Sequence, residues 1–503
     1  MAPPESGGGA PAVLKVAEGG FHPRLRAPTS PPQHHGRGKM ALGIEWIGHG
    51  ITRITDEAER ALNETTLRIA ITGLSRSGKT IFITSLIANL LAMGRGRDTL
   101  PALSRRMAEE GRRIEAVRLE PAGTQALDWF DATDKLRDLA GSSPHWPPRT
   151  SDLASAALTL VVERPGSWGR WLPPRRVRLE LLDYPGEWLL DLPLLDQDHA
   201  EWSETTLRLL RQAPRAGVAG DFLAFLAGLD PAAPAEEAVA RRGFMLYRDM
   251  LVAARDHLGL RWLQPGRFLV PGPKGESPMM WFFPMPGSGS PAPGTLRELL
   301  SRRFDAYRDD MRRSYFDPWF AQFDRQVVLV DALGALCAGE GAFEDARQAV
   351  AQIARAYDAR SRSRWFGFST LRRVAFVATK ADYVPEAQRN AFENLFRNMV
   401  GGGDGGRTVN HAAISALRCT EEAPHTTQGP PVVLGVPMGE TRRRPFRPGH
   451  IPAQPPPPGD AFWSRPYFEL PVFRPPVIDP EGREGLPHIG MDRLLAWLLE
   501  DAL

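Results

Sequence analysis

Lysine, cysteine and long apolar runs are scarce in this chain of 503 residues, and the scarcity of the last two excludes whole classes of protein. The only cysteines, Cys337 and Cys419, exclude a disulfide framework and indicate a reducing compartment. No run approaches the roughly 20 apolar residues of a membrane-spanning helix, and the N-terminus lacks the apolar stretch of a signal peptide. A net charge of +3 is too small for this length to indicate polyanion binding over the whole surface, and no known nucleic-acid-binding module is present. We therefore expect a soluble cytoplasmic protein with no specific nucleic acid as a partner.

Lysine is outnumbered by arginine, six to 56, and two of the six lysines lie in motifs that need an ammonium group. The segment Gly73-Leu-Ser-Arg-Ser-Gly-Lys-Thr80 is a complete G-x-x-x-x-G-K-[ST] phosphate loop. The segment Thr379-Lys-Ala-Asp382 is a variant of the N-K-x-D tetrad that reads guanine. Between them, Asp183-Tyr-Pro-Gly186 matches the D-x-x-G by which a GTPase senses the γ-phosphate. Three motifs in this order indicate a GTP-binding P-loop protein.

The first 64 residues divide into two predicted segments. Residues 1–40 are rich in Gly and Pro without periodic apolar positions, so we expect disorder, with Met40 as an alternative start of the protein. An amphipathic helix is predicted over 41–64, because apolar residues recur there at helical spacing. These residues are Ile44, Ile47, Ile51, Ile54, Ala58 and Ala61. The apolar stripe either packs on the body of the protein or meets a membrane or partner surface.

Short apolar segments predict a series of buried strands. They are Leu67–Thr72, Leu158–Val162, Val177–Leu182, Val327–Val330 and Val374–Ala378. Helices are predicted at Lys79–Leu91 and Glu344–Tyr357. Strands that alternate with helices favour an α/β fold, the three-layer sandwich of P-loop NTPases with a mainly parallel sheet. The motifs then fall at the carboxyl ends of strands, where such sheets bind ligands.

Two stretches, residues 65–200 and 321–425, should together form the nucleotide-binding G domain. The first stretch carries the phosphate loop and both switches, and the second carries the guanine-reading loops. The intervening residues 201–320 are too many for a bare loop, and helical patterns occur at Trp202–Gln212 and Ala238–His257. We therefore expect a large, mostly helical insertion.

Three further apolar or proline-dense stretches lie outside these patterns. Leu269–Pro271 and Met279–Phe283, within the insertion, have no assigned structure. Residues 426–503 are predicted to form a Pro-rich C-terminal extension. That extension is expected to end in an amphipathic helix over Met491–Leu503.

The phosphate loop predicts specific contacts with nucleotide and metal. Its glycines let backbone N–H groups surround the phosphates, and the following helix adds the positive end of its dipole. Lys79 should reach the β- and γ-phosphate oxygens and so act in catalysis, while the Thr80 hydroxyl and the Asp183 carboxylate should hold Mg²⁺. The loop residues expected to contact the nucleotide are Gly73, Ser75, Arg76, Ser77, Gly78, Lys79 and Thr80.

The residues Gly186 and Glu187 bear on hydrolysis. The Gly186 N–H should donate to the γ-phosphate and so report its presence, although this four-residue sequence also occurs in ordinary turns. Glu187 stands where many GTPases have a Gln that orients the attacking water. A carboxylate accepts a hydrogen bond from water but cannot donate one, so hydrolysis is where the comparison with GTPases is weakest.

Base selection should depend on Asp382. Its two oxygens can accept from N1–H and the 2-amino group of guanine, and adenine offers neither donor. The stem of Lys380 can cover the purine face. Thr379 replaces the usual Asn and cannot supply an amide N–H₂, which affects affinity more than specificity.

Two more loops are candidates for the site, each with an ordinary surface loop as the alternative. Ser415 and Ala416 follow the apolar run Ala412–Ile414, and their backbone could meet guanine O6. Thr150 precedes the second predicted strand, where a second Mg²⁺-binding hydroxyl is expected. Its neighbour Arg149 is a candidate catalytic arginine supplied by the same chain.

With these residues identified, the chain resembles the YcjX-like family of bacterial P-loop GTPases, which is associated with envelope stress. The resemblance extends over residues 41–503 and includes Trp146-Pro-Pro-Arg-Thr150, Asp183-Tyr-Pro-Gly-Glu-Trp188, Trp281-Phe-Phe-Pro284 and the Thr379 tetrad. It implies a GTP-binding core, expected to hydrolyse GTP, with a helical insertion. It also implies a gene that often lies beside one for a membrane protein.

One further feature of the sequence suits a membrane-protein partner or an anionic membrane surface. Either partner would place the protein peripherally at the inner membrane. Five arginines interleave with aromatic residues, a pattern that suits anionic head groups but is also typical of a solvated helix end before a buried aromatic cluster. They are Arg360, Arg362, Arg364, Arg372 and Arg373, with Trp365, Phe366 and Phe368.

Three functions remain open from the sequence. The first is a Mg²⁺-dependent switch that binds GTP and GDP and hydrolyses GTP slowly. The second is a nucleotide-binding scaffold with little turnover, which Glu187 keeps open. The third is an ATPase or kinase, against which Asp382 argues.

Overall fold

The computed structural model describes residues 64–120, 127–140, 144–147, 153–166, 171–272, 275–287, 289–320, 322–362, 371–401, 408–423, 432–464 and 470–503. The predicted tail 1–40 and the predicted helix up to residue 63 lie outside these ranges. Glu64, assigned to that helix by the sequence, is instead the first residue of a strand. Arg149 and Thr150 also lie outside the described residues.

An eight-stranded sheet lies at the centre of the fold, with β3 beside β4 and the other strands in the order β2-β4-β5-β1-β6-β7-β8. The strands are β1 (Glu64–Gly73), β2 (Ile114–Glu120), β3 (Asp128–Trp129), β4 (Ala154–Val162), β5 (Arg175–Asp183), β6 (Arg325–Val330), β7 (Arg373–Ala378) and β8 (Val409–Ala413). Strand β1 pairs in parallel with β5 and β6, and β6, β7 and β8 continue in parallel. The predicted α/β fold with a mainly parallel sheet is confirmed.

Part of the sheet is antiparallel, which the strand-helix alternation did not predict. Strand β4 runs antiparallel to both β5 and β2. The reason is the short connection, residues 163–174, between β4 and β5: antiparallel neighbours can be joined by a hairpin, whereas parallel ones need a long crossover. Strand β2 itself was missed, although its sequence alternates apolar and charged residues with a bulge between Ile114 and Ala116.

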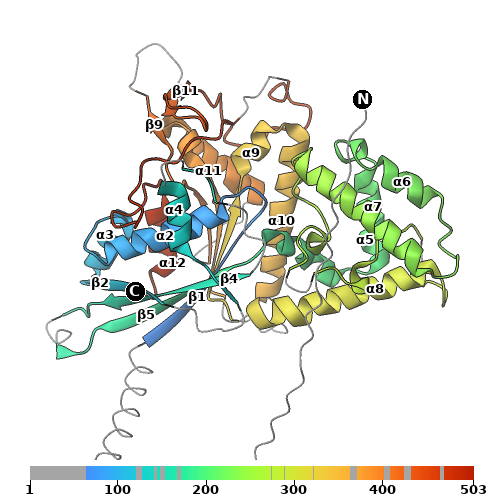
Figure 1. Cartoon of the computed structure of the whole chain (residues 1–503), viewed down its shortest axis with the longest axis horizontal. Helices are drawn as coiled ribbons and strands as arrows, with labels where there is room; N and C mark the ends of the chain where they lie inside the picture. Colours follow the sequence, from blue (N-terminus) through green and yellow to red (C-terminus); the bar gives the residue numbers. More distant parts are fainter. Residues whose placement is uncertain are drawn as a thin grey trace, which may run out of the picture. The chain divides into compact units, whose positions relative to one another are not determined.

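Helices cover both faces of the sheet, and Figure 1 shows α2 and α10 on opposite sides of it. The period of two residues along β1 determines which side chains each layer buries. Leu67, Ile69 and Ile71 belong to one core, with α2 (Lys79–Met93), α3 (Pro101–Glu109) and α12 (Met491–Leu499). Ala70 belongs to the other, with α10 (Glu340–Arg362) and α11 (Glu386–Val400). This is the predicted three-layer sandwich. The helix predicted over Glu344–Tyr357 lies inside α10.

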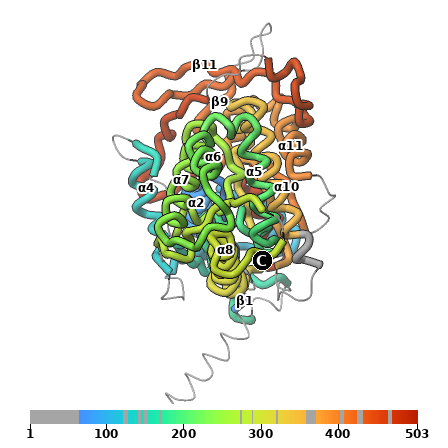
Figure 2. Tube along the Cα trace, turned by 90° about the vertical axis from the view of Figure 1, so that its right-hand side faces the viewer, coloured from blue at the N-terminus to red at the C-terminus, as the bar shows by residue number. Residues whose placement is uncertain are grey.

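Four helices lie between β5 and β6. Two further helices lie outside this stretch: α4 (Ala132–Ala140) precedes β4, and α9 (Ala332–Cys337) follows β6. The four are α5 (His199–Leu210), α6 (Gly220–Ala227), α7 (Glu237–Asp256) and α8 (Leu296–Met311), and the π-helix η6 (Arg312–Phe320) continues α8. Figures 1 and 2 agree that α5 to α8 group together beside the sheet. Their core is aromatic: the buried Trp202 ring lies 5.3 Å from that of Phe304 and 5.6 Å from that of Phe282. The segment Met279–Phe283, unassigned from the sequence, thus fills this helical core.

The C-terminal part holds a second, three-stranded antiparallel sheet that the sequence did not predict. Its strands are β9 (Thr420–Glu422), β10 (Val433–Gly435) and β11 (Arg444–Phe446). Strands of three residues are too short for an alternating pattern to be visible, and Pro445 suits only an edge strand. The final helix α12 ends at Leu499 and not at Leu503 as expected.

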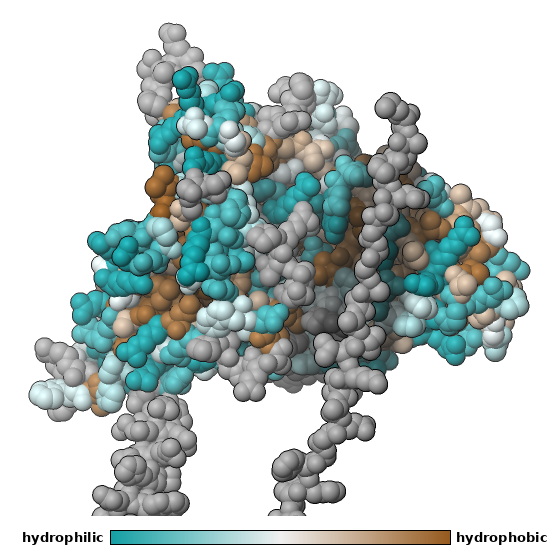
Figure 3. Space-filling view, viewed as in Figure 1, coloured by the Kyte–Doolittle hydropathy of each residue, from teal (hydrophilic) through white to brown (hydrophobic). Residues whose placement is uncertain are grey.

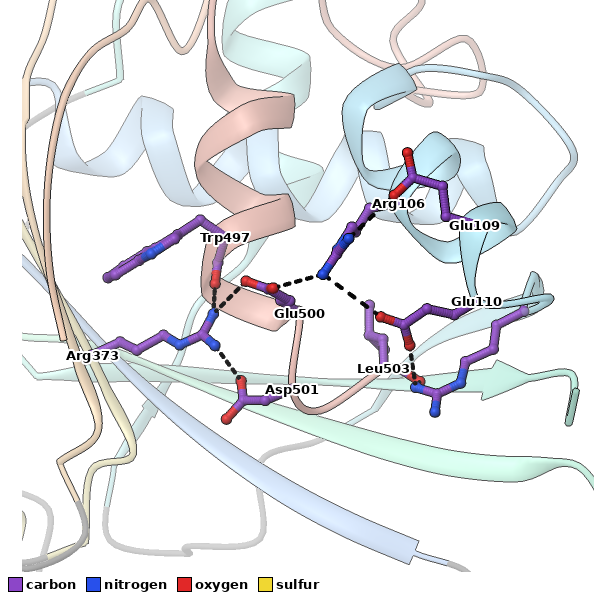
Figure 4. Close-up of polar contacts among 9 residues, drawn as sticks. Arg106, Glu109, Glu110, Arg373, Trp497, Glu500, Asp501 and Leu503 are labelled. Carbon is purple, nitrogen blue, oxygen red and sulfur yellow. Dashed lines mark hydrogen bonds and ion pairs between the residues drawn. The ribbon is translucent and has the colours of Figure 1, made fainter. Parts of the chain in front are cut away.

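Arginines attach helix α12 to the sheet and to α3, and Figure 4 shows these contacts. Arg373 of β7 donates to the Trp497 carbonyl oxygen and lies 3.4 Å from the Asp501 carboxylate. Arg106 of α3 forms an ion pair of 2.8 Å with Glu500. Arg373 therefore stabilises the docking of α12, and we remove it from the proposed arginine and aromatic patch; most of the remaining patch lies outside the described residues.

The surface of the described residues mixes polar and apolar side chains. Figure 3 shows hydrophilic and hydrophobic residues interspersed on the viewed face. The large exposed apolar residues come from separate parts of the chain: Trp129, Trp171, Leu172, Met245, Met438, Val472 and Val477. Within the described ranges, no helix combines the length and the apolar character needed to cross a membrane.

Candidate functional site

The ends of five neighbouring strands bring the sequence motifs to one edge of the sheet. In the parallel registers, Gly73 pairs with Leu329, Ile71 pairs with Asp183, and Ala378 pairs with Val330 and Ala413. Because these strands are parallel, the loops that follow them all leave the sheet at its carboxyl edge. The phosphate loop, the D-x-x-G segment, the Thr379 tetrad and the Ser415 loop therefore share this edge.

The phosphate loop makes a tight turn between β1 and α2. Gly78 and Arg76 adopt the left-handed backbone conformation, with φ of 78° and 67°. Gly78 has no Cβ to strain this conformation, and Arg76 adopts it as a single non-glycine residue. Gly73 is needed for space, since a Cβ there would lie 2.1 Å from the Ser77 Oγ. A turn of this kind before the N-terminus of a helix is suited to binding an anion through backbone N–H groups.

Lys79 joins the phosphate loop to the D-x-x-G segment. Its Nζ lies 2.6 Å from Asp183 Oδ1 and donates to the Tyr184 carbonyl oxygen at 2.8 Å. Asp183 is 1% exposed, and burial raises the pKa of its carboxyl group while the Lys79 ammonium opposes the rise. Apart from this ion pair, neither Asp183 oxygen accepts a hydrogen bond from the described residues.

A divalent cation fits the polar groups beside Asp183. A buried carboxylate with Lys79 as its one polar partner is a suitable ligand for Mg²⁺ or for its bound water. Thr80 is the second residue of α2, directly after Lys79. No group of three or more His, Cys, Asp or Glu residues in the described part of the chain could hold a metal by itself. Mg²⁺ would therefore depend on phosphate oxygens and water as well as on Thr80 and Asp183, as is usual for this ion.

The residues after Tyr184 pack directly on the phosphate loop. Gly186 is the first residue of the 3₁₀ helix η2 (Gly186–Asp196), which lies close to Gly73. Next to it, the Ser75 Oγ donates to Glu187 Oε1 at 3.2 Å. Glu187 is thus oriented toward the phosphate loop, where an attacking water would have to be positioned.

The Thr379 tetrad is shaped by one strained backbone position and one ion pair. Lys380 has φ of 64°, and its Nζ lies 2.6 Å from Asp331 Oδ2. Asp331 follows β6 and is 7% exposed. Asp331 was not predicted from the sequence, although an acidic residue directly after a buried strand is a recognisable signal. Thr379 is buried and its N–H donates to the Val330 carbonyl oxygen at 3.0 Å.

Asp382 connects the tetrad to the Ser415 loop. The Cys419 N–H donates to Asp382 Oδ2 at 3.0 Å, and the Ser415 hydroxyl, which donates to the Leu417 carbonyl oxygen at 2.9 Å, lies beside this carboxylate. Burial, the largest effect, raises the Asp382 pKa, and these donors oppose the rise. The Ala381 N–H donates to the Ile414 carbonyl oxygen at 3.0 Å. Ala416 follows Ser415 in this loop, so both candidate base contacts lie beside Asp382.

A buried aspartate that the sequence did not indicate links η2 to the helical segment. Asp191 is fully buried and accepts hydrogen bonds from the backbone of Gly266 at 2.7 Å and Arg267 at 3.3 Å, and from the hydroxyl of Tyr307. Desolvation raises the Asp191 pKa to about 6. Arg267 lies over the Tyr315 ring at 4.7 Å. The segment that follows the D-x-x-G motif is therefore tied to α8 and to the loop before it.

Comparisons with known proteins agree with this arrangement of motifs. The family model of the YcjX-like family, DUF463, matches residues 67–503. A protein named Ras-like GTPase YcjX from Escherichia coli strain K12 is 32% identical over 455 residues, which cover 87% of this chain and 96% of the relative. A protein of the same name from Shewanella oneidensis MR-1 is 30% identical over 480 residues, which cover 90% and 98% of the two chains. The fold, the ordered motifs and these matches together show that the chain belongs to the YcjX-like family.

Proposed function

We propose that this protein binds GTP and GDP with Mg²⁺ and hydrolyses GTP slowly as a molecular switch. The observation that carries the proposal is the ion pair between Lys79 and Asp183, which joins a phosphate loop to a D-x-x-G segment. Both groups are needed by a bound nucleoside triphosphate, one for its phosphates and the other for its metal. The relatives named as Ras-like GTPases support the same assignment.

In this proposal each motif keeps a separate role. Gly73, Ser75, Arg76, Ser77 and Gly78 surround the phosphates, and Lys79 neutralises their charge. Thr80, Asp183 and Thr150 would hold Mg²⁺, which would neutralise charge on the nucleotide phosphates. The Gly186 N–H senses the γ-phosphate. On the base side the contacts come from Thr379, Lys380, Asp382, Ser415 and Ala416.

The preference for guanine rests on the environment of Asp382. Its carboxylate is 2% exposed, lies at the end of β7, and is oriented by donors from the Ser415 loop. A buried acceptor pair penalises adenine, which places an acceptor where guanine has a donor. This argues against the ATPase or kinase alternative.

Glu187 leaves the scaffold alternative in place. Its contact with Ser75 keeps the carboxylate near the phosphate loop. A carboxylate can accept a proton or a hydrogen bond from the attacking water but cannot donate to the γ-phosphate as an amide does. We therefore propose slow turnover, and a GTP-loaded scaffold is the second function.

The cellular setting follows the family and is part of the proposal. We propose a cytoplasmic protein that acts in envelope stress, with a membrane protein or the anionic inner-membrane surface as its partner. Residues 65–200 and 321–425 would bind nucleotide, and the helices within 201–320 would present the surface that changes. The C-terminal residues 426–503 would support the base-binding side.

Three measurements on the purified protein test this function. The nucleotide that copurifies is identified first, and guanine nucleotide is expected. Affinities for GTP, GDP and ATP are then measured with and without Mg²⁺, together with single-turnover GTP hydrolysis. Tight GTP binding with slow hydrolysis supports the switch, tight binding without hydrolysis supports the scaffold, and ATP competing as well as GTP contradicts the guanine assignment.

A further inference from the structure

The loop after α7 places an arginine, Arg261, beside the phosphate-binding end of the sheet. The backbone at this point is fixed by Asp345 of α10, which is 3% exposed. Asp345 accepts hydrogen bonds from the Arg261 N–H and, at 2.8 Å, from the Trp262 N–H, and it also forms an ion pair with Arg215. Three donors on one buried carboxylate define the position of the Arg261 backbone with little freedom.

The same loop packs on the segment that contains Glu187. A Cβ at Gly266 would lie 1.8 Å from the Glu187 carbonyl oxygen, so the two backbones are in direct contact. Asp191 then accepts the Gly266 N–H. The loop that carries Arg261 is therefore held from two sides, by α10 and by the segment that follows the D-x-x-G motif.

Charged residues of three loops lie within electrostatic range of Arg261. Its electrostatic partners are Asp331 at the end of β6, Arg76 of the phosphate loop, and Glu187, together with its anchor Asp345. The first three are the end of a central strand, the phosphate loop and the proposed water-positioning residue. Together with the contact between Gly266 and the Glu187 backbone, these neighbours place the Arg261 loop at the γ-phosphate side of the proposed nucleotide site.

The Arg261 guanidinium is half-buried but makes no ion pair with any described residue. Its one hydrogen bond is from Nη1 to the carbonyl oxygen of its neighbour Leu260 at 3.1 Å. Burial is the largest effect on the Arg261 pKa and lowers it, and Arg76 acts in the same direction. By contrast, Arg255 on α7 forms two contacts of 2.9 Å with Asp256. A desolvated guanidinium without a carboxylate contact has its donors available for an anion.

We propose that Arg261 is a catalytic arginine, supplied in cis by the helical segment, that contacts the transferring phosphoryl group of GTP. This inference rests on the proposed GTPase function. In the reaction the water oxygen forms a bond to the γ-phosphorus, and the bond to the β,γ-bridging oxygen breaks with its electron pair going to GDP. The water protons end on the phosphate product and in solvent. Arg261 donates N–H groups to the oxygens on which negative charge increases.

Arg261 also explains how Glu187 can take the place of the usual amide. A glutamine both accepts from water and donates to the γ-phosphate, and Glu187 can only accept. Arg261 interacts with Glu187 and supplies donors of permanent charge at the same place. The water-orienting and charge-neutralising functions would then belong to two residues from different segments. Arg149, the candidate from the sequence, is the alternative source of the arginine.

The test compares Arg261→Ala, Arg261→Lys and Arg149→Ala with the control Arg302→Ala on an exposed position of α8. Single-turnover GTP hydrolysis, GDP affinity, and affinity for GDP with aluminium fluoride, which mimics the transferring phosphoryl group, are measured for each folded variant. We expect Arg261→Ala to lower hydrolysis by at least roughly 100-fold. Its GDP affinity should be unchanged, its aluminium fluoride complex should be lost, and Arg261→Lys should recover part of both.

The other outcomes are distinct. Hydrolysis and aluminium fluoride binding that survive Arg261→Ala overturn the proposal, and their loss in Arg149→Ala assigns the arginine to the sequence-based candidate. Loss of GDP affinity in Arg261→Ala would show a structural role and also overturns it. A wild-type protein that binds no GTP, or binds it without hydrolysis, contradicts the proposed function itself before any variant is compared.

Discussion

Gly186 lies directly against Gly73: a β-carbon at residue 186 would be 2.0 Å from the Gly73 carbonyl oxygen. The glycine of the D-x-x-G segment therefore contacts the phosphate loop backbone to backbone. If the segment moves when a γ-phosphate binds, it must therefore move relative to the phosphate loop. Since η2 runs from Gly186 to Asp196 and contains Asp191, the same movement would reach the helical segment through the hydrogen bond between Gly266 and Asp191.

We predict that Gly186→Ala removes the preference for GTP over GDP. The added methyl group must displace the Gly73 carbonyl or move residue 186 away from the γ-phosphate, and either change removes the proposed N–H contact. Affinities for GDP and a non-hydrolysable GTP analogue measure the effect. Gly217→Ala, where a β-carbon meets nothing within 4 Å, is the matched control. An unchanged preference in a folded Gly186→Ala variant would place the γ-phosphate sensor elsewhere.

Lys79→Ala is expected to abolish nucleotide binding almost completely. The substitution removes the ammonium of the phosphate loop and leaves both the phosphates and the buried Asp183 carboxylate without their counter-charge. Fluorescent GTP and GDP titrations measure the loss, and Lys135→Ala on α4 serves as a control of the same chemical change. Near-native GTP affinity in the folded Lys79→Ala protein contradicts the phosphate-loop assignment.

Asp382→Asn should shift the preference from guanosine to xanthosine nucleotides. The new amide donates to the 2-oxo group of xanthine, whereas the carboxylate accepts from the 2-amino group of guanine. The expected loss of guanine discrimination is ~1–3 kcal/mol per unpaired buried group. Competition between GTP and XTP measures this change. If the variant retains the wild-type preference for GTP, another residue reads the base.

Asp191→Asn should change how the free energy of unfolding depends on pH. The folded-state pKa of Asp191, about 6, lies above its ordinary value of 3.8, so the folded protein binds this proton more tightly than the unfolded chain. The wild type therefore loses stability relative to the variant as pH rises from about 4 to about 6, by an amount of order ~2–3 kcal/mol. Urea unfolding at several pH values measures the difference.

Asp249→Asn, on an exposed position of α7, is the control for the Asp191 measurement. Its difference from wild type should not follow the same pH dependence. Groups that titrate identically in both proteins, such as the buried His199, cancel in the comparison. A difference between wild type and Asp191→Asn that is flat from pH 4 to pH 7 would mean that Asp191 does not titrate in the folded protein.

Local sequence patterns were sufficient for the sheet core and its motifs. Strands such as Val374–Ala378 are uniformly apolar because they are buried on both faces, and glycine and lysine spacing in the phosphate loop is fixed by the phosphate chemistry. Those constraints act within a few residues of each other. They identified Lys79, Asp183 and Asp382 without any knowledge of the fold, and the roles of these residues remain to be tested.

Tertiary structure decided the antiparallel pairing of β4 and the formation of the short strands β9 to β11. It also decided the positions of Asp191, Arg261 and Asp331. A single buried aspartate or arginine has no periodic signal, because its meaning depends on partners such as Tyr307 or Asp345 that are far away in the chain. The sequence by itself therefore determined which nucleotide chemistry is available. Which distant charges surround the nucleotide site was decided only by the packing of the helical segment on η2. The reason is that electrostatic interactions act through space and not along the chain.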